Sequence, residues 1–270
     1  MPLAISNILW TPEQEGAALI AAKAAGTDGI EVAPSRIARW DALTPATAIA
    51  YRAKLADNGL TIPSMQALLF GVRDVALLAD TASYQRLADH LTRVADIAAI
   101  LGARVLVFGA PKQRLRGALD APAANALAAE RLRPIGDALH QRGVVLGIEP
   151  VPAAYGADFL HNVTEVATLV RQVNHPTIRL HLDTGALHLA GEDVSVVTAN
   201  ADILCHVHLS RQLLAPLTEA LPLDAPLAAA LQALPYHGWL SIEIGPQAEP
   251  LPVINKALPL ARTLYGALLT

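Results

Sequence analysis

Four polar residues stand at or near the ends of short apolar runs that resemble strands. Glu149 lies in VVLGIEP, Asp183 in TIRLHLDT, His208 in ILCHVHLS and Glu243 in WLSIEIG. Carboxylates and imidazoles rarely remain in apolar surroundings unless a partner offsets the cost of burial. Three acids and one histidine form a mostly hard ligand set. We therefore predict a cage for one divalent metal ion, Mn²⁺ or Mg²⁺ before Co²⁺ or Zn²⁺. A buried ion-pair network is the alternative.

The elements that must position these residues alternate along the chain. Strand-like runs lie at 4–9, 29–33, 62–69, 104–110, 144–150, 178–184, 203–210 and 239–245. Helical stretches rich in alanine and leucine lie near 12–25, 44–57, 83–101, 122–141, 163–173, 192–200, 224–234 and 249–267. Eight such pairs predict an α/β fold, a single (β/α)8 TIM barrel over residues 1–270. A doubly wound open sheet is the lesser alternative.

Residues suited to helix ends occur at several of these boundaries. Thr11-Pro12, Asp120 and Asn162 are expected helix starts. Glycine is expected to end the preceding helix in a left-handed conformation at Gly26, Gly59, Gly102, Gly143 and Gly238.

Alternation within the runs indicates which side chains share a face, because residues i and i+2 of a strand point the same way. The predicted polar faces carry His181 with Asp183, Leu204 with His206 and His208, and Ser241 with Glu243. Cys205 falls on an apolar face and is expected in the core. The polar faces should point into the barrel, with the four ligands at the carboxyl ends where TIM barrels build active sites.

Other polar residues are expected near the same interior. His181 and His206 lie below the ligands and should support them or fill the core. Glu31 would either join the interior set or hold a neighbouring arginine. Gln66 would either join it or cap a loop.

Composition excludes several classes of protein. The 270 residues carry a net charge of −4 without a basic block, which leaves nucleic acid no electrostatic footprint. No run is apolar enough to cross a membrane and the start lacks a basic leader, so we expect a cytoplasmic protein. Phosphate-loop, dinucleotide and nucleophile-elbow motifs are absent, so no organic cofactor is expected.

The motifs resemble the xylose-isomerase-like TIM barrel superfamily, which contains sugar-phosphate isomerases and epimerases and enzymes like endonuclease IV (AP endonuclease family 2). The resemblance runs through GIEVAPSR, SMQALLFG, VLVFGAPKQR, GIEPVPAAYGADFLHN, LHLDTGALHLAGED, HVHLS and SIEIG. It implies that Glu149, Asp183, His208 and Glu243 bind one divalent metal. It also implies that Glu149 and Glu243 are the catalytic acid/base pair, one on each face of the inverted carbon.

Ligand set and resemblance together predict an isomerase or epimerase acting on a sugar, sugar phosphate or polyol-derived ketose. A metal chelated by a carbonyl and its neighbouring hydroxyl would stabilise an enediolate while carboxylates remove and return a proton. A hydride shift would need the same ligands. The alternatives are a metal-dependent lyase or hydrolase on a carbohydrate derivative and a non-catalytic sugar-binding or partner subunit.

Candidates for substrate binding are Gln66, Lys112 and His188. Lys112 and Arg114 would bind a phosphate or carboxylate, or remain solvated loop charges. Family epimerases carry a histidine three residues after the strand-six Asp; here that position is Ala186. His188, two residues further on, would either reach the substrate or lie on a surface loop.

The segment after the seventh run departs from the family pattern. HVHLS leads directly into Arg211, and the following residues 213–223 are mostly apolar. The usual polar spacing before a substrate-binding arginine is missing, so the role of Arg211 is open. The apolar loop would cover the site, contact a neighbouring subunit in a homo-oligomer, or pack on the barrel.

Overall fold

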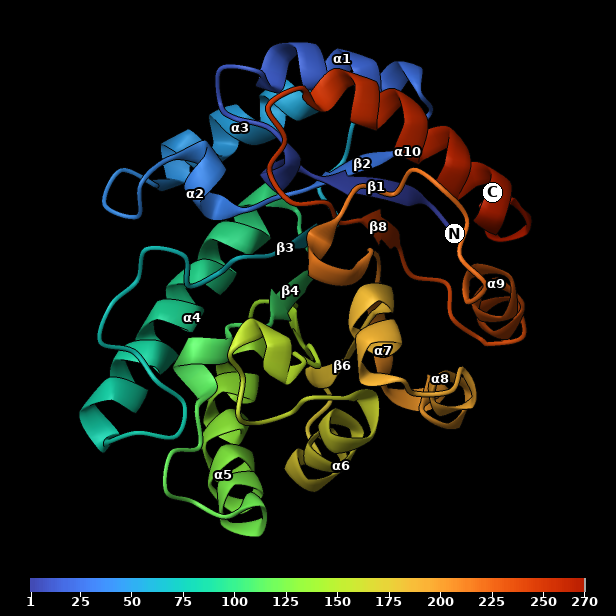
Figure 1. The fold of residues 1–270 in the computed structure, drawn as a ribbon. Helices are drawn as coiled ribbons and strands as arrows, with labels where there is room; N and C mark the ends of the chain where they lie inside the picture. The colour runs from blue at the N-terminus through green and yellow to red at the C-terminus, as the bar shows by residue number, and fades with distance from the viewer. Residues whose placement is uncertain (270) are drawn as a thin grey trace.

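Eight parallel strands form a ring that helices surround, as the computed structural model of residues 1–269 shows (Figure 1). The strands are β1 (Leu3–Ser6), β2 (Gly29–Glu31), β3 (Ser64–Met65), β4 (Val105–Phe108), β5 (Val145–Ile148), β6 (Ile178–Asp183), β7 (Leu204–Leu209) and β8 (Leu240–Ile242). Their order is β2-β1-β8-β7-β6-β5-β4-β3. Backbone hydrogen bonds from Ile30 N to Thr61 O (2.9 Å) and from Gln66 N to Val32 O (3.0 Å) link β2 to the β3 segment.

This topology confirms the predicted (β/α)8 TIM barrel. Parallel bridges from Gly29 to Thr61 and from Val32 to Met65 join β2 and the β3 segment, the two ends of the strand order, so the sheet closes on itself and the open doubly wound alternative is wrong. Because all strands are parallel, their carboxyl ends lie at one mouth of the barrel. Among the described residues, no helix is both long and apolar enough to cross a membrane.

Ten α-helices lie within the described residues, two more than predicted. They are α1 (Glu15–Ala24), α2 (Pro34–Ile37), α3 (Pro45–Asp57), α4 (Thr81–Leu101), α5 (Ala121–His140), α6 (Val163–Val173), α7 (Thr184–Ala190), α8 (Ser195–Ala199), α9 (Asp224–Gln232) and α10 (Pro250–Tyr265). The two unpredicted helices, α2 and α7, follow β2 and β6 within a few residues. Short 3-10 turns η2 (Pro111–Arg114), η3 (Ala153–Tyr155) and η5 (Gln212–Leu214) follow β4, β5 and β7.

Helix ends follow the predicted capping residues at most positions. The Asp120 side chain accepts a hydrogen bond from Ala123 N (2.8 Å), and Asn162 accepts one from Glu165 N (2.9 Å). The predicted start at Thr11-Pro12 is wrong, because α1 begins at Glu15 without a side-chain cap. Four of the five expected glycines have positive φ, namely Gly26, Gly59, Gly102 and Gly143.

Gly238 is the exception, because it is absent from the positive-φ glycines. A Cβ at this position would overlap the Tyr236 ring, so close approach explains the glycine here.

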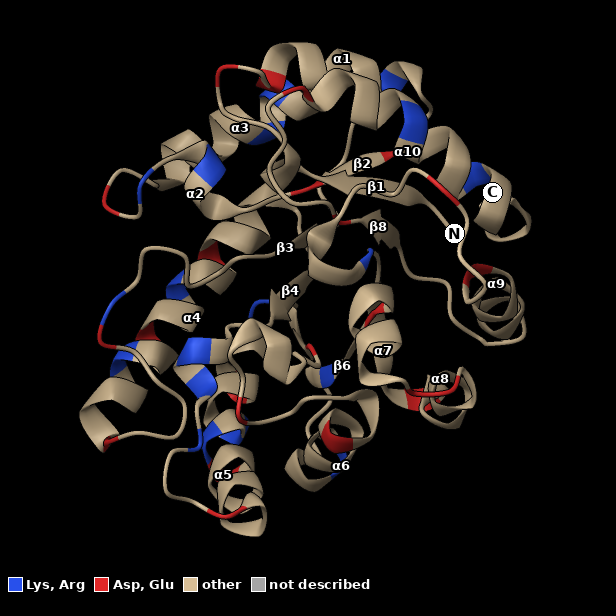
Figure 2. Cartoon of the chain, in the orientation of Figure 1, with Lys and Arg blue, Asp and Glu red and all other residues tan. Residues whose placement is uncertain are grey.

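The outward faces of the strands supply the apolar core beneath the helices. Leu180, Leu182, Val207 and Leu209 are each at most 1% exposed. Burying a side chain of this size contributes about 1.5–3 kcal/mol, so the helix layer holds the strands firmly in register. In the view of Figure 2, basic and acidic residues are interspersed over the outer helices.

The start of β7 departs from the predicted alternation of inward and outward side chains. Leu180 pairs with Leu204 and His181 pairs with His206, so Cys205 is an extra residue in a β-bulge. A Cβ added to Gly147 would lie 2.9 Å from Cys205 Sγ, which shows that the thiol packs against β5. Cys205 is also half-buried and not a core residue. The bulge breaks the alternation that placed Leu204 on the face of His206.

Candidate metal centre

The four predicted ligands converge at the carboxyl ends of β5, β6, β7 and β8. Glu149 and Glu243 directly follow β5 and β8, Asp183 ends β6, and His208 is the second-last residue of β7. One ligand atom of each lies within 4.8 Å of those of the other three. Glu149 is half-buried and the other three are buried. Strands that are adjacent in the barrel therefore bring together residues spread over 95 positions of the sequence.

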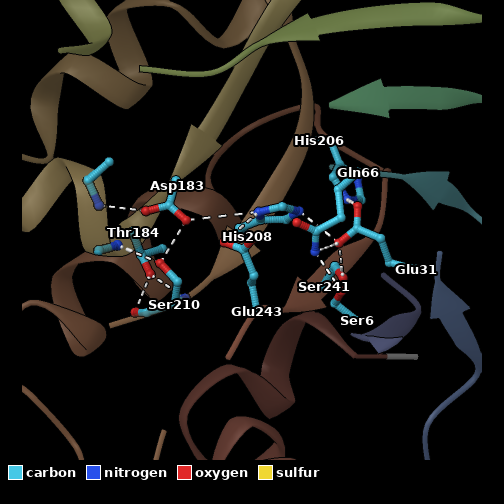
Figure 3. Close-up of polar contacts among 12 residues, drawn as sticks. Ser6, Glu31, Gln66, Asp183, Thr184, His206, His208, Ser210, Ser241 and Glu243 are labelled. Carbon is cyan, nitrogen blue, oxygen red and sulfur yellow. Dashed lines mark hydrogen bonds and ion pairs between the residues drawn. The ribbon is translucent and has the colours of Figure 1, made fainter. Parts of the chain in front are cut away.

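His208 lies between the ligand cluster and the barrel interior, as Figure 3 shows. Its Nδ1 lies 3.2 Å from Glu243 Oε2 and 3.9 Å from Asp183 Oδ2. The opposite nitrogen, Nε2, lies 2.8 Å from Glu31 Oε2. The side chain is fully buried, and neither ring nitrogen has a partner at normal hydrogen-bond geometry. These contacts are ion pairs, and Nδ1 faces the ligand cluster as a buried atom without a hydrogen-bond partner.

Asp183 is fixed by the chain that follows it. Its Oδ1 accepts a hydrogen bond from Ala186 N (2.5 Å), and its Oδ2 accepts one from Ser210 Oγ (2.7 Å). Asp183 is thus the N-cap of α7, which explains why this helix begins directly after β6. A Cβ at Gly185 would lie 2.7 Å from the Arg211 carbonyl, so only glycine allows α7 to approach the β7 loop.

Arg114 holds the backbone of Glu149, and the Glu149 side chain packs closely against Gly109. Arg114 Nη1 donates to the Glu149 carbonyl oxygen (2.7 Å), and Arg114 is 1% exposed. Arg114 is therefore neither a solvated charge nor an accessible anion site, which corrects both predicted roles. A Cβ at Gly109 would overlap Glu149 Oε2, so the glycine leaves room for the carboxylate.

Electrostatic repulsion within the cluster favours a bound cation. Burial and the charges of Glu243 and Asp183 hold the pKa of Glu149 well above its usual range. Burial and Glu243 raise the pKa of Asp183 to about 6. Burial would lower the pKa of His208, but the carboxylates of Glu31 and Glu243 outweigh it and raise that pKa well above its usual value.

The residues fit a divalent cation. Carboxylate oxygens within 4.8 Å of one another repel by more than about 3 kcal/mol at an effective dielectric constant near 20. Three oxygen-donor side chains and one imidazole with an unpartnered Nδ1 face the same point. Oxygen-rich sets of this kind suit hard divalent ions such as Mg²⁺ and Mn²⁺.

A second polar layer lies below the cluster, around Glu31. Glu31 Oε1 lies 3.2 Å from His206 Nε2, and Ser241 Oγ donates to Glu31 Oε2 (2.9 Å). The partners of Glu31 are thus two histidines, a serine and Gln66, so the predicted arginine partner is wrong. Burial would raise the pKa of Glu31, but the charge of His208 and contacts with His206 hold it well below the usual range.

Gln66 belongs to this interior layer as well. Its Nε2 donates to Ser6 Oγ (2.5 Å) and lies 3.4 Å from Glu31 Oε2. It does not cap a loop, and its amide nitrogen already has partners. His181 packs against His208 with ring centroids 4.2 Å apart, and burial with the charges of His208 and His206 keeps its pKa well below the usual value.

Two cavities open beside the ligand cluster. One of about 430 Å³ is lined by Glu149, Gln66, Lys112 and the segment that follows β3. The other, of about 160 Å³, is lined by three of the four ligands, together with Tyr155 and Leu214. Both include Glu149 and the adjoining segment 109–111, so a small substrate can reach the ligands from the mouth of the barrel.

Tyr155 was not predicted from the sequence. Its hydroxyl accepts a hydrogen bond from Leu213 N (2.7 Å), which ties the loop after β5 to the loop after β7. Leu213 and Leu214 have φ values of 56° and 55°, an unusual pair for residues with Cβ atoms. Gly245 N donates to Leu214 O (2.8 Å), so the start of the apolar loop packs on the site. The sequence carried one signal for this role, an aromatic residue six positions after the strand-end ligand Glu149.

His188 and Arg211 lie away from the ligand cluster. Both line a third cavity, to which none of the four ligands contributes. Arg211 is 8% exposed, and its guanidinium contacts both carboxylate oxygens of Asp224 at 2.8 and 3.1 Å. Its Nη2 also donates to Glu219 O (2.9 Å). The Arg211 guanidinium therefore stabilises the connection between β7 and α9.

Comparison with known proteins agrees with this architecture. The xylose isomerase-like TIM barrel family matches residues 19–263. The chain therefore belongs to the xylose isomerase-like TIM barrel family, which confirms the resemblance seen in its motifs. No curated protein matches the sequence.

Solved structures with similar folds include several sugar epimerases. L-ribulose 3-epimerase has a TM-score of 0.83 at 17% identity, covering 99% of this chain and 96% of that one. D-psicose 3-epimerase from Clostridium cellulolyticum H10, solved with D-tagatose, has a TM-score of 0.82 at 14% identity, covering 100% of both chains. The 3-keto-D-glucoside 4-epimerase from E. coli has a TM-score of 0.78 at 16% identity, covering 97% and 99%. At these identities the likeness establishes the fold.

Proposed function

We propose that this protein is a divalent-metal-dependent isomerase or epimerase of a sugar, sugar phosphate or polyol-derived ketose. The observation that carries the proposal is the cluster of Glu149, Asp183, His208 and Glu243, whose ligand atoms lie within 4.8 Å of one another beside two cavities. Family membership and the sugar epimerases among the similar structures support the same chemistry.

These four residues would hold the cation. A divalent ion in this position supplies a Lewis acid that polarises a substrate carbonyl and offsets the negative charge that develops when the neighbouring carbon loses a proton. The protein's own part is to bind the substrate against the cluster, exclude water from it and move the proton.

Glu149 and Glu243 are the proposed acid and base. They follow β5 and β8, with β6 and β7 between them, so their carboxylates approach the cluster from different sides of the mouth. The raised pKa of Glu149 suits a group that exchanges protons near neutral pH. One carboxylate takes the proton from one face of the carbon and the other returns a proton to the opposite face. Return to the neighbouring carbon would give isomerisation.

Lys112 is the proposed contact for an anionic substituent, because it lines the larger cavity together with Glu149. Gln66 lines that cavity too, although its amide nitrogen is engaged by Ser6. His188 lines a different cavity, and we therefore give it no role in binding this substrate.

Turnover of a panel of ketoses and ketose phosphates in D₂O, with Mn²⁺ present, tests the proposal. We expect deuterium beside the carbonyl of the product, observed by NMR and mass spectrometry. Glu149→Gln and Glu243→Gln should abolish turnover with the far-UV circular dichroism unchanged. Near-wild-type turnover by either variant would remove that glutamate from the acid/base pair. Loss of water or of a leaving group would indicate a lyase or hydrolase, and a ligand bound but unchanged would indicate a binding subunit.

A further inference from the structure

Glu31 is a fully buried carboxylate that lies outside the ligand cluster but contacts one of its members. Its Oε2 lies 2.8 Å from His208 Nε2 and accepts a hydrogen bond from Ser241 Oγ (2.9 Å). Figure 3 shows Glu31 on the opposite side of His208 from Asp183. A buried carboxylate is costly unless it is paired, and the contact with His208 supplies that pairing. The question is then what Glu31 does for His208.

The two nitrogens of His208 have different surroundings. Ionised carboxylates carry only acceptors, and they face both ring nitrogens, Glu31 on one side and Glu243 on the other. A metal ion held by Glu243 and Asp183 would take the place of a hydrogen on Nδ1, which leaves Nε2, facing Glu31, to carry the hydrogen. A neutral imidazole with its hydrogen on Nε2 has its lone pair on Nδ1. Nδ1 is the nitrogen that lies 3.2 Å from Glu243 and 3.9 Å from Asp183, facing the ligand cluster.

We propose that Glu31 is a positioning residue that keeps the hydrogen of His208 on Nε2 and thereby presents Nδ1 to the metal ion. This inference rests on the proposed metal centre and extends it from the ligands to the residue that orients one of them. Carboxylates that accept a hydrogen from a ligating histidine fix its tautomer and ring orientation and raise its basicity. Ser241 Oγ and Gln66 Nε2 also donate to Oε2, at 2.9 and 3.4 Å, and help to hold Glu31 in place.

His206 provides a matched control. It lies on the same strand, is 1% exposed, and contacts Oε1 of the same carboxylate at 3.2 Å. It belongs to no group of possible ligand atoms that includes Asp183 or Glu243. His206 lies beside His208, with ring centroids 5.4 Å apart, so replacing it removes a comparable buried contact of Glu31 and a comparable neighbour of His208 while Glu31 and all four proposed ligands remain.

Calorimetric titration of Mn²⁺ into the metal-free protein tests the effect on affinity. We expect Glu31→Gln to weaken binding by about 10- to 100-fold, and His206→Gln to change it by less than about threefold. Equal affinities of Glu31→Gln and the wild type would overturn the proposal. Equal losses in the two variants would also overturn it, because they would reduce Glu31 to a general packing role.

The tautomer can be observed without any variant. In wild-type protein labelled with ¹⁵N-histidine and loaded with diamagnetic Zn²⁺, long-range ¹H–¹⁵N correlations should show His208 with hydrogen on Nε2 and metal on Nδ1. Metal on Nε2, beside Glu31 and His206, or absence of metal from His208 would overturn both this inference and the proposed metal centre. Equal Mn²⁺ affinities of Glu31→Gln and the wild type would overturn this inference alone. Neither experiment measures turnover, so a failure to find an epimerase substrate leaves this inference unaffected.

Discussion

Metal binding by this protein should depend steeply on pH between 7 and 5. The ligands must lose their protons to bind a cation. The carboxylates of Glu31 and Glu243 raise the pKa of His208 well above its usual value, so a proton on His208 competes with the metal ion. The pKa of Asp183 is raised to about 6, and that of Glu149 is also raised. Each raised pKa lets protons compete with the metal, so affinity must rise with pH.

The magnitude follows from the number of protons displaced. At pH 6, binding should release about half a proton from Asp183, with further shares from His208 and Glu149. Each displaced proton costs about 1.4 kcal/mol per pH unit. From pH 7 to pH 5, Asp183 alone contributes about tenfold, and the raised pKa values of His208 and Glu149 act in the same direction, so we expect affinity to fall by more than about tenfold, or about 1.4 kcal/mol.

Titration calorimetry with Mn²⁺ at pH 7, 6 and 5 provides the assay. Paired buffers with different ionisation enthalpies count the protons released at each pH. Far-UV circular dichroism at pH 5 controls for acid unfolding, and His208→Ala controls for binding elsewhere. An affinity loss below about tenfold over this range, or release of less than about half a proton at pH 6, would refute the electrostatic account of the cluster.

Three substitutions test other parts of the structure. Gly109→Ala should lower turnover by about 100-fold with stability retained, because the added methyl group displaces the Glu149 carboxylate; unchanged kinetics would contradict this. Asp224→Asn should destabilise the protein by about 3–5 kcal/mol in urea unfolding by leaving Arg211 buried without its charge partner. A change smaller than 1 kcal/mol would show that the ion pair is not needed. Lys112→Ala should raise KM for a phosphorylated ketose and leave KM for its neutral analogue unchanged; equal effects on both would exclude an anion contact.

Much of the fold could be predicted because its signals are local. Runs with period two and stretches with helical period alternate eight times, and each needs only neighbouring residues to be recognised. The helix starts at Asp120 and Asn162 are equally local, since each side chain caps a backbone N–H three residues away. Helix α7 was missed because its cap is Asp183, a residue that the sequence presents as a strand-end ligand.

The convergence of the four ligands was also predictable, once a barrel was assumed. Parallel strands bring their carboxyl ends to one mouth, so four polar residues at four strand ends had to meet. The partners of other polar residues were not predictable in this way. Glu31 pairs with histidines of β7, and Arg114 and Arg211 are buried against a backbone carbonyl and Asp224.

The sequence by itself determined the eight strand–helix units, the barrel and the strand ends at which the candidate ligands lie, because these depend on hydrophobic period and on chain order. Only the tertiary structure decided which groups face one another. A single extra residue at Cys205 shifts the register of β7, and His188 opens onto a cavity separate from the ligands. Such outcomes depend on contacts between segments far apart in the chain, which no local pattern encodes.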